Sequence, residues 1–490
     1  MPNQKIPLST PYKNIDDTSL TSQLNIIQDG YLDESDAIHQ RPGLELLVDL
    51  GTNKKVDGLF WSDTKEVVMA VSNGKTFKIT DKFGANTDLT GNSLIPERPV
   101  SFAEAYSGAD LYLFMANGGG LTFTNYTANT QLLSGSSTPA LTGTGSPPTN
   151  ITSLVNFNTY MITNSEDSNS WYFSNPNSPF AWDLSDSYDA EKSPDSVDAI
   201  KVVNNRLLIC GKSSIEPWYN AGTPGDPLLR SLKANFVNAG VLSPFSIDVV
   251  DENRMFFINK DRRIASIQGN SYQVLSKAYD KEIQGFSSAR DAVAFTLNEG
   301  GKSFYVISFP QDKKTLVYDI ELKHWYEWGY WNETKSQYEI FKGNCYTYAR
   351  KWNQHLIGSS DGKIYKVSSS YYNDAGDTIR GKVVTGHANY GSDAVLKNSK
   401  RLTGRFKRGV GKSSDSYTEP YFLIRKRDNG KSKWSDYKKV DLGKLGETEL
   451  SRTISTRNGR YYTRQMEIVF PDDAPFVMSG LWEDLEAESR

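Results

Sequence analysis

Four histidines are the residues best suited to metal binding or acid–base chemistry in this chain of 490 residues. They are His39, His324, His355 and His387. None belongs to a His-x-x-x-His or His-Glu-x-x-His pattern, the spacing that turns two ring nitrogens toward a shared metal ion. We therefore expect exposed or hydrogen-bonded histidines, with no metal ion and no cofactor.

The sequence also lacks the motifs of nucleophilic and phosphate-transfer enzymes. It contains neither a Gly-x-Ser-x-Gly elbow nor a Walker loop. The run Gly118–Gly120 fits a tight turn before Leu121 better than a phosphate cradle. These observations predict a protein that is not an enzyme.

Carbohydrate binding or cleavage, as in a receptor-binding component, is the alternative to a protein without enzymatic activity. Five of the seven residues from Trp325 to Trp331 are aromatic, and such rings can stack on sugars. The same cluster also suits an outer strand packed between sheets. The turn at Ser359–Tyr365 approaches the Ser-x-Asp-x-Gly-x-x-Trp repeat of sialidase-like propellers, but its Gly is one place early and its Trp is missing.

A basic region lies toward the carboxyl end. Residues 380–464 hold 21 Lys and Arg against 8 Asp and Glu, a balance of about +13 in a chain whose net charge is -3. The rest of the chain is therefore acidic, and the basic region is suited to an acidic partner surface or, alternatively, to DNA phosphates. The candidate partner-interface residues are Lys400, Arg401, Arg405, Lys407, Arg408, Arg425, Lys426 and Arg427.

A repeated unit must position these residues. Ser72–Ile79 is echoed by Ser360–Val367, and each is a polar-Gly turn that leads into a short strand with a central aromatic residue. Five weaker copies lie between them, so third strands can be anchored at Phe77, Phe123, Tyr172, Trp218, Ile264, Tyr318 and Tyr365. Several strands per unit at a period of about 40–50 residues indicate propeller blades. An irregular β-sandwich is the alternative.

The fold class expected is all-β, a propeller of about seven blades with an arm before it and a smaller domain after it. The arm spans 1–57, and its Pro42-Gly43 pair predicts a type II turn before a strand at Leu44–Leu50, a segment able to close the propeller. The propeller spans 58–372, with insertions near 134–150 and 220–244. A basic domain resembling a β-sandwich spans 373–490, and its acidic end, Trp482–Arg490, is expected to form a short helix or a loose tail.

Composition favours folding in a cytosol. The two cysteines, Cys210 and Cys345, lie far apart, so a disulfide framework is not expected. Met1–Tyr12 lacks the apolar stretch of a secretory signal, and no run of about 18 apolar residues predicts a membrane span.

The ordered set of motifs between 171 and 222 resembles that of a known family. It comprises Trp171-Tyr172-Phe173-Ser174, Phe180-Ala181-Trp182-Asp183, Tyr188-Asp189-Ala190-Glu191, Pro194-Asp195, Gly211–Glu216 and Trp218–Gly222. This order is similar to that of the tail accessory, or packaged-DNA stabilisation, proteins of short-tailed bacteriophages. The Arg41-Pro42-Gly43 turn after the arm resembles theirs as well. The resemblance covers roughly residues 20–370.

The resemblance implies a structural virion protein that folds in the host cytoplasm and forms the hub or nozzle ring of the tail. Members of the family are similar in forming homo-oligomeric rings, usually hexamers, below the portal and adaptor proteins. The ring continues the DNA channel, helps to retain the packaged genome until ejection, and docks fibres, spikes or a needle. Genomic DNA would pass through it without sequence recognition. A ring requires contacts between two different faces of the subunit, which the split between acidic and basic regions can supply.

Overall fold

The computed structural model describes residues 4–8, 26–89, 94–126, 132–133, 145–190, 195–222, 229–232, 235–412, 418–447, 449 and 451–488. Part of the first predicted insertion, residues 134–144, therefore lies outside the described residues.

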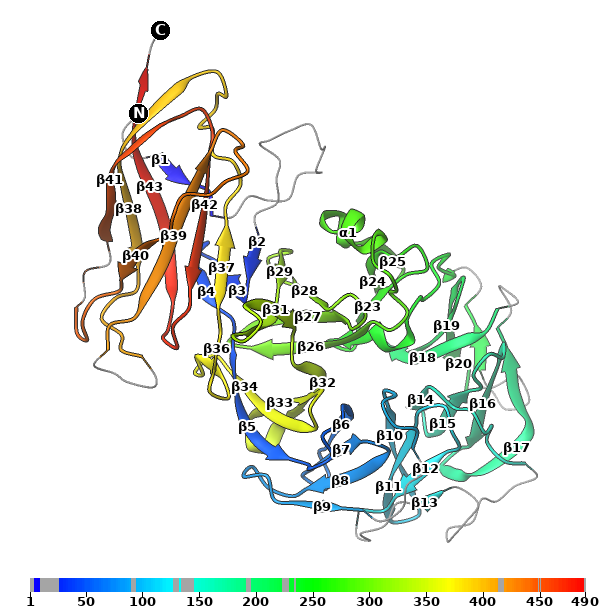
Figure 1. Cartoon of the computed structure of the whole chain (residues 1–490). Helices are drawn as coiled ribbons and strands as arrows, with labels where there is room; N and C mark the ends of the chain where they lie inside the picture. Colours follow the sequence, from blue (N-terminus) through cyan, green and yellow to red (C-terminus); the bar gives the residue numbers. More distant parts are fainter. Residues whose placement is uncertain are drawn as a thin grey trace.

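Four-stranded antiparallel sheets follow one another around a central axis (Figure 1). The first sheet comprises β6 (Val56–Ser62), β7 (Val67–Ser72), β8 (Lys75–Ile79) and β9 (Asn86–Asp88). The second comprises β10 (Ser101–Ser107), β11 (Asp110–Ala116), β12 (Thr122–Thr124) and β13 (Leu132–Leu133). The third comprises β14 (Leu154–Phe157), β15 (Tyr160–Asn164), β16 (Ser170–Asn175) and β17 (Ser178–Asp189).

The next three sheets repeat this plan. The fourth comprises β18 (Val197–Val203), β19 (Arg206–Gly211), β20 (Ile215–Asn220) and β21 (Leu229–Ser231), the last of which lies inside the second predicted insertion. The fifth comprises β22 (Asp248–Val250), β23 (Arg254–Ile258), β24 (Ile264–Gln268) and β25 (Ser271–Val274), followed by the helix α1 (Asp280–Gln284). The sixth comprises β26 (Val293–Glu299), β27 (Lys302–Phe309), β28 (Lys314–Asp319) and β29 (Trp325–Glu327).

An arm strand completes the last sheet. It comprises β32 (Gly343–Ala349), β33 (Gln354–Ser359), β34 (Lys363–Ser368) and, on its outer edge, β5 (Gly43–Asp49). The described strands thus form seven four-stranded units, and each of the seven anchor residues predicted from the sequence lies in the third strand of its unit. The propeller architecture expected from the sequence is the one observed.

Local chemistry explains the tight hairpins of the units. Asn73 and Gly74 link β7 to β8 with φ angles of 53° and 74°. Asn204 and Asn205 link β18 to β19 with φ angles of 49° and 54°. Two-residue hairpin turns with positive φ match the twist of paired strands, and Asn and Gly adopt that conformation at the lowest cost.

Apolar side chains fill the spaces between neighbouring units. One cluster packs Met69 and Val71 of the first unit against Leu113 and Met115 of the second. Similar clusters join the second unit to the third, the third to the fourth, the fourth to the fifth, the fifth to the sixth and the seventh to the first. A unit buries both faces of its sheet only by packing against two neighbours, so the ring is the stable arrangement.

The type II turn predicted at Pro42-Gly43 is not observed. Gly43 is the first residue of β5, and it is not among the residues with positive φ. A Cβ atom at Gly43 would lie 2.5 Å from the carbonyl oxygen of Tyr371 and 2.6 Å from that of Asn373. Glycine is therefore required there for close backbone packing and not for a type II turn.

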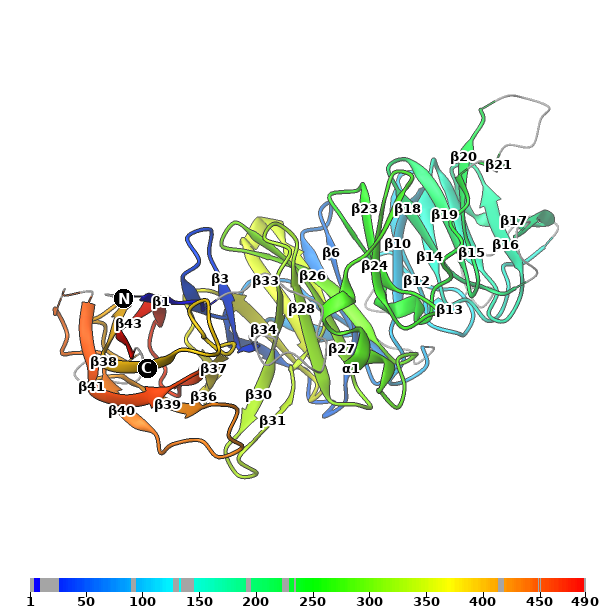
Figure 2. The same cartoon turned by 90° about the horizontal axis from the view of Figure 1, so that it is seen from above.

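Two sheets form the domain beside the propeller (Figure 2). One has the order β3 (Gly30–Leu32), β4 (Ile38–Gln40), β43 (Val477–Glu488), β38 (Leu396–Phe406) and β41 (Ser451–Tyr461), with β1 (Gln4–Ile6) also paired to β43. The other contains β2 (Ile26–Gln28), β37 (Gly381–Val384), β42 (Arg464–Phe470), β39 (Tyr421–Asp428) and β40 (Lys438–Asp441). Phe406 of the first sheet packs edge-on against Phe422 of the second, with 5.2 Å between the ring centroids.

The arm joins this sandwich to the propeller. Strand β2 pairs with β37 on one side and with β29 of the sixth unit on the other, so one sheet of nine strands runs through both parts. Two short hairpins lie at the same junction, namely β30 (Gly329–Asn332) with β31 (Gln337–Ile340), and β35 (Asn373–Asp374) with β36 (Asp377–Thr378).

The predicted tail at Trp482–Arg490 is wrong for its described part. Residues 482–488 belong to β43, which lies between β4 and β38 in the six-stranded sheet. The side chains of Met478, Leu481 and Leu485 are buried, and Glu483 is buried with them, whereas Asp484 and Glu486 are at least partly exposed. The acidic composition of the segment concealed this strand pattern.

Candidate functional site

The candidate interface residues divide between the two sheets of the sandwich. Lys400, Arg401 and Arg405 lie on β38, and Lys407 and Arg408 follow it. Arg425, Lys426 and Arg427 lie on β39 in the other sheet. The fold therefore brings the second group together but separates it from the first.

Acidic partners neutralise part of the first group. The ammonium of Lys400 lies 2.9 Å from a carboxylate oxygen of Glu486 on β43, and Arg401 lies 3.9 Å from Asp484. Arg408 pairs with Glu447. The exposed pairs of Lys400 and Arg401 contribute about 0–1 kcal/mol each. All three pairs reduce the net positive charge that a partner would meet.

Neighbouring side chains of β39 point in opposite directions. The guanidinium of Arg425 lies 2.7 Å from Glu467 and 4.4 Å from the ring centre of Tyr437, on the outer face of the sheet. The ammonium of Lys426 instead donates a hydrogen bond to the carbonyl oxygen of Asn458. Burial and the nearby charge of Arg464 lower the pKa of Lys426. Lys426 is therefore poorly placed to meet a partner.

A buried ionic cluster holds the two sheets of the sandwich together. Arg464 of β42 donates to both oxygens of Asp428, at 2.7 and 2.9 Å, and to Glu483 of β43 at 2.8 Å. Glu483 also accepts hydrogen bonds from Tyr461, from Ser399 at 2.9 Å and from Tyr390 at 3.0 Å. Arg464 and Glu483 are buried but fully paired, which is how a charge is tolerated inside a protein.

A second buried arginine lies at the junction of arm, propeller and sandwich. Arg41 donates to both oxygens of Asp374 at 2.9 and 2.6 Å, to Asp29 at 2.8 Å, and to the carbonyl oxygens of Pro42 and Gly329 at 3.0 and 2.9 Å. All its donors thus point at acceptors from three segments. Burial raises the pKa of Asp29 to about 6, although the charge of Arg41 opposes this. The cluster gives the Arg41-Pro42-Gly43 motif a physical role.

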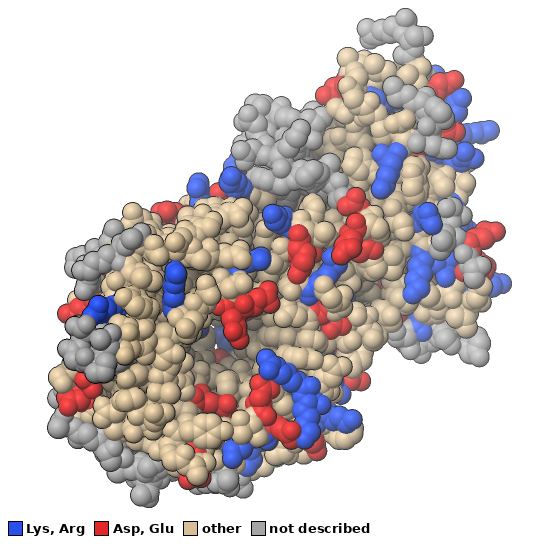
Figure 3. Space-filling view, turned by 180° about the vertical axis from the view of Figure 1, so that it is seen from behind, with Lys and Arg blue, Asp and Glu red and all other residues tan. Residues whose placement is uncertain are grey.

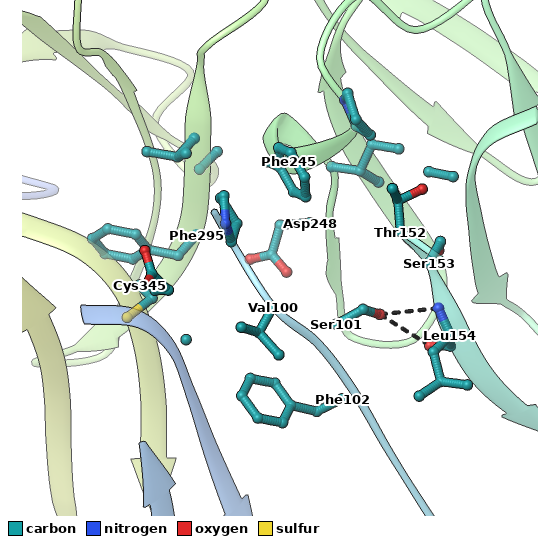
Figure 4. A pocket seen from close by; sticks show the side chains of 18 of the residues that line it. Val100, Ser101, Phe102, Thr152, Ser153, Leu154, Phe245, Asp248, Phe295 and Cys345 are labelled. Carbon is teal, nitrogen blue, oxygen red and sulfur yellow. Dashed lines mark hydrogen bonds between the residues drawn. The ribbon is translucent and has the colours of Figure 1, made fainter. Parts of the chain in front are cut away.

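The inner strands of all seven units surround an axial cavity of about 430 Å³ (Figure 4). Val100, Phe102, Phe245 and Phe295 form much of its apolar wall, and Figure 4 shows the carboxylate of Asp248 between them. Asp57, Asp198 and Lys201 also line it. The hydroxyl of Ser101 is held to the backbone of Leu154 by two hydrogen bonds.

Burial shifts the titration of the charged groups of this cavity. It raises the pKa of Asp57 to about 7, against the charge of Lys55, and it raises the pKa values of Asp198 and Asp248. It lowers the pKa of Lys201. Sequence reasoning missed these residues, although Asp57, Asp198 and Asp248 share a signal, since each is the first or second residue of an innermost strand.

The tryptophan cluster does not form an open sugar platform. Trp328 is 2% exposed and packs between Phe304 and Phe341. Trp325 donates to the carbonyl oxygen of Leu275 and packs on Tyr279 beside the fifth unit. The ring of Trp331 is covered by Arg380, whose guanidinium lies 4.3 Å from the ring centre. The carbohydrate alternative thereby loses its main support.

The histidines lie in four separate places. His39 pairs with Asp33 at 3.0 Å, and His355 lies 2.8 Å from the hydroxyl of Tyr346. Burial lowers the pKa values of His324, His355 and His387. Within the described residues, no three His, Cys, Asp or Glu side chains come together as metal ligands. The helices of this same part of the chain include none long and apolar enough to cross a membrane.

Part of the chain matches the model of a known protein family. The family model of phage stabilisation proteins, described as bacteriophage P22 Gp10, beta-propeller, matches residues 21–372. A search of the curated proteins found no match.

Two solved structures are similar in part. The N-terminal domain of Nup159 has a TM-score of 0.39 and 11% identity, over 71% of this chain and 99% of that chain. The extracellular domain of a putative one component system from B. thetaiotaomicron has a TM-score of 0.42 and 9% identity, over 91% of this chain and 60% of that chain.

The family match spans much of the arm and the whole propeller, well over half of the chain. The all-β propeller fold and the resemblance to phage tail accessory proteins are thus both confirmed. The protein belongs to the phage stabilisation family of bacteriophage P22 Gp10, and it is a structural protein of a phage tail with a part in stabilising packaged DNA.

Proposed function

We propose that this protein forms the hub or nozzle ring of a short-tailed phage, with six copies arranged below the portal and adaptor proteins. The observation that carries the proposal is the joining of arm, propeller and sandwich into one building block by the nine-stranded sheet and the Arg41 cluster. A ring subunit must keep two separate faces at a constant angle, because small errors add up around the ring. A continuous sheet and a buried bidentate ion pair resist that bending.

The DNA path lies between subunits in this arrangement. The axial cavity of about 430 Å³ has the size of a small-molecule pocket. Duplex DNA, whose major groove alone is about 12 Å wide, does not fit into it. The channel is therefore bounded by outer surfaces of several copies. Acidic propeller surface facing this channel would repel phosphates and let the genome slide without sequence recognition.

The surface accommodates several partners. Figure 3 shows Lys, Arg, Asp and Glu interspersed over one face of the propeller and sandwich, with a hollow at the propeller centre. Mixed charge of this kind suits contacts with proteins better than it suits a nucleic-acid groove. We assign the adaptor side and the fibre, spike or needle side to different surfaces of the ring, with no catalytic step. The protein folds in the host cytoplasm and ends in the virion tail, where it retains DNA until ejection.

Electron microscopy of virions, together with native mass spectrometry of the purified protein, tests this proposal. The expected result is a closed ring, six copies in the tail, and a central channel between the subunits. A protein that stays monomeric at every concentration and is missing from virions would contradict it. A channel wall dominated by Lys and Arg would contradict the sliding argument while leaving the ring intact.

A further inference from the structure

Cationic side chains stacked on aromatic rings line the outer face of the sandwich beside the propeller. Arg380 covers Trp331, Lys382 lies 5.1 Å from the ring centre of Tyr338, and Arg427 lies 4.7 Å from that of Trp434. Arg425 lies between Trp434 and Tyr437, at 5.1 and 4.4 Å. We call these eight residues the arginine–aromatic face; they are Arg380, Lys382, Arg425, Arg427, Trp331, Tyr338, Trp434 and Tyr437.

The face is continuous even though its members come from four segments of the chain. The phenol of Tyr437 donates to Glu467, which also pairs with Arg425. The charges of Arg425 and Arg380 both act on Tyr437, whose pKa burial and Glu467 raise to about 12. The charge of Arg380 also acts on Tyr338, whose hydroxyl donates to the Arg380 carbonyl oxygen at 2.6 Å. One stacked patch therefore bridges the β30–β31 hairpin and the nine-stranded sheet.

Most cations of this face have no internal partner of opposite charge. Arg425 is paired with Glu467, but among the described residues no carboxylate forms an ion pair with Arg380, Lys382 or Arg427. The ε nitrogen of Arg427 donates to the neutral side chain of Gln465 at 2.5 Å. A guanidinium whose plane is stacked on a ring still presents its N–H groups at the edge, in the fork that binds carboxylates in pairs. The arginine–aromatic face can therefore bind carboxylates of a partner.

An acidic edge of the propeller offers that chemistry. Strand β17 is the outermost strand of the third unit, so one side of its backbone has no neighbouring strand in that sheet. It carries Asp183, Asp186 and Asp189 and no Lys or Arg. Burial and the charge of Asp183 raise the pKa of Asp186, so the carboxylates of Asp183 and Asp186 repel each other. A cationic partner would remove that repulsion.

The two surfaces lie on opposite sides of the propeller. Figure 1 shows β31 and β37 where the propeller meets the sandwich and β17 across the propeller from them, and Figure 2 shows the same separation. The overall charge division agrees, since residues 380–464 carry about +13 and the rest of the chain about -16. Two different complementary surfaces on separate sides of a subunit produce head-to-tail contacts, which close into a ring when the rotation permits.

We propose that the arginine–aromatic face of one subunit docks on the β17 edge, at Asp183, Asp186 and Asp189, of the next copy of this chain. The inference rests on the proposed ring and identifies its subunit contact. Single-stranded nucleic acid suits the face less well, because bases need uncovered rings to stack on and these rings are already covered by the chain's own cations. Arg, Trp and Tyr are also the residues that dominate binding at protein interfaces.

Charge reversal tests the contact in the full-length chain. R380E/R427E alters the face and D183K/D186K alters the edge, while R405E, on the other sheet, is the matched control. We expect each double variant to weaken self-association by about 100-fold or more, as buried charge contacts do at interfaces. R405E should assemble like the wild type. Analytical ultracentrifugation and native mass spectrometry measure the assemblies, and circular dichroism verifies that each variant is folded.

Mixing the two variants gives a sharper result. The face variant keeps an acidic edge for the unchanged face of the edge variant, and its own acidic face matches the basic edge of that variant. The mixture should therefore recover rings in which the two variants alternate, although neither variant assembles alone. A single chain that carries all four reversals should recover rings, because the complementarity is restored with exchanged signs. The milder R380Q/R427Q variant should show an intermediate loss if a reversal variant fails to fold.

The outcomes distinguish a failure of the proposed subunit contact from a failure of the proposed ring. Wild-type rings together with double variants that still assemble fully would overturn this contact and leave the ring standing. A wild type that stays monomeric at every concentration and is missing from virions would overturn both. A fluorescent single-stranded oligonucleotide that binds the wild type but not R380E/R427E, with ring formation unchanged, would assign the face to nucleic acid and overturn the proposal.

Discussion

Buried carboxylates occur in two regions of this molecule, which differ in whether a fully paired cation lies between them. At the junction, Asp29 and Asp374 surround Arg41, and each donor of the guanidinium has an acceptor. In the axial cavity, Asp57, Asp198 and Asp248 surround no such cation, and Lys201, which also lines the cavity, acts on Asp248. Oxygen Oδ1 of Asp57 has no hydrogen bond, and the same is true of oxygen Oδ2 of Asp29 at the junction. In the first region the buried charge of Arg41 connects separate segments of the chain. In the second region the buried charges make no such connection.

The difference shows what a buried charge can do for a fold. A completely paired guanidinium binds its acceptors in one geometry only, so it fixes the relation between arm, sixth unit and sandwich. The carboxylates of the cavity fix no such relation, because their desolvation is poorly compensated. We therefore expect replacements at the junction to be costly and replacements in the cavity to be neutral or favourable, depending on pH.

Removal of the central cation should have the largest effect. Arg41→Met leaves Asp29 and Asp374 buried without their partner, and we expect a loss of about 3–5 kcal/mol in the free energy of unfolding. Urea unfolding followed by fluorescence measures it. The exposed Arg405, which forms no ion pair among the described residues, supplies the control Arg405→Met. A loss below about 1 kcal/mol would show that the cluster does not organise the junction.

Neutralising one carboxylate of the same cluster should cost less. Asp374→Asn retains one acceptor oxygen for Arg41 but removes a charge and one of two hydrogen bonds, so we expect a loss of about 1.5–3 kcal/mol. Combining it with Arg41→Met in a double-mutant cycle tests the coupling between the two residues. Strictly additive losses would mean that the ion pair itself contributes nothing.

The cavity should respond in the opposite direction, and only at neutral pH. Because burial raises the pKa of Asp57 to about 7, the folded protein holds that proton more tightly than the unfolded chain does. Stability from this group is therefore present near pH 4 and is lost as pH rises to about 7. Asp57→Asn should leave stability unchanged near pH 4 and raise it by roughly 1–4 kcal/mol at pH 8.

Thermal unfolding across this pH range, with the exposed Asp110→Asn as control, measures the effect of Asp57. The control should follow the wild type at every pH. Some pH dependence should remain in Asp57→Asn, because the pKa of Asp29 is raised to about 6. A variant that is destabilised equally at pH 4 and pH 8 would show that Asp57 has a structural role independent of its charge.

An exposed ion pair should give the smallest effect. Lys400 and Glu486 are both more than half exposed, so Lys400→Ala should change the free energy of unfolding by at most about 0.5 kcal/mol. Lys407→Ala, which removes an exposed lysine without an ion pair among the described residues, is the control. A larger loss for Lys400 alone would mean that surface pairing stabilises β43 against β38.

The sequence predicts the propeller because each unit repeats a local pattern. Phe77, Tyr172 and Tyr365 can be found from short-range alternation and turn residues, and the structure places all three in third strands. The fourth strands were harder to see, because several of them, such as β9 (Asn86–Asp88), are short and polar. Strand β5 illustrates a further limit, since its partner β34 lies about 320 residues away.

The candidate site was predicted less well than the fold. Arg425 and Arg427 are close in the sequence and in the structure, but Arg380 and Trp331 join them only through the pairing of β2 with β29 and β37. Because the aromatic residues of the face come from separate segments, the sequence shows no alternation of aromatic and basic residues. The cavity carboxylates were missed because the position that Asp57, Asp198 and Asp248 share becomes apparent only when the innermost strands are known.

The order of strand pairing has a consequence for the time course of folding. Strand β5 leaves the ribosome early but must wait for β34 before the propeller can close, and β3 and β4 of the arm must wait for β43. Loop closure over such distances is slow, and chains dominated by distant pairings fold slowly. Nascent protein would therefore expose β5 without its partner until residue 368 has been synthesised. We expect such an exposed strand to favour aggregation and to make folding dependent on chaperones.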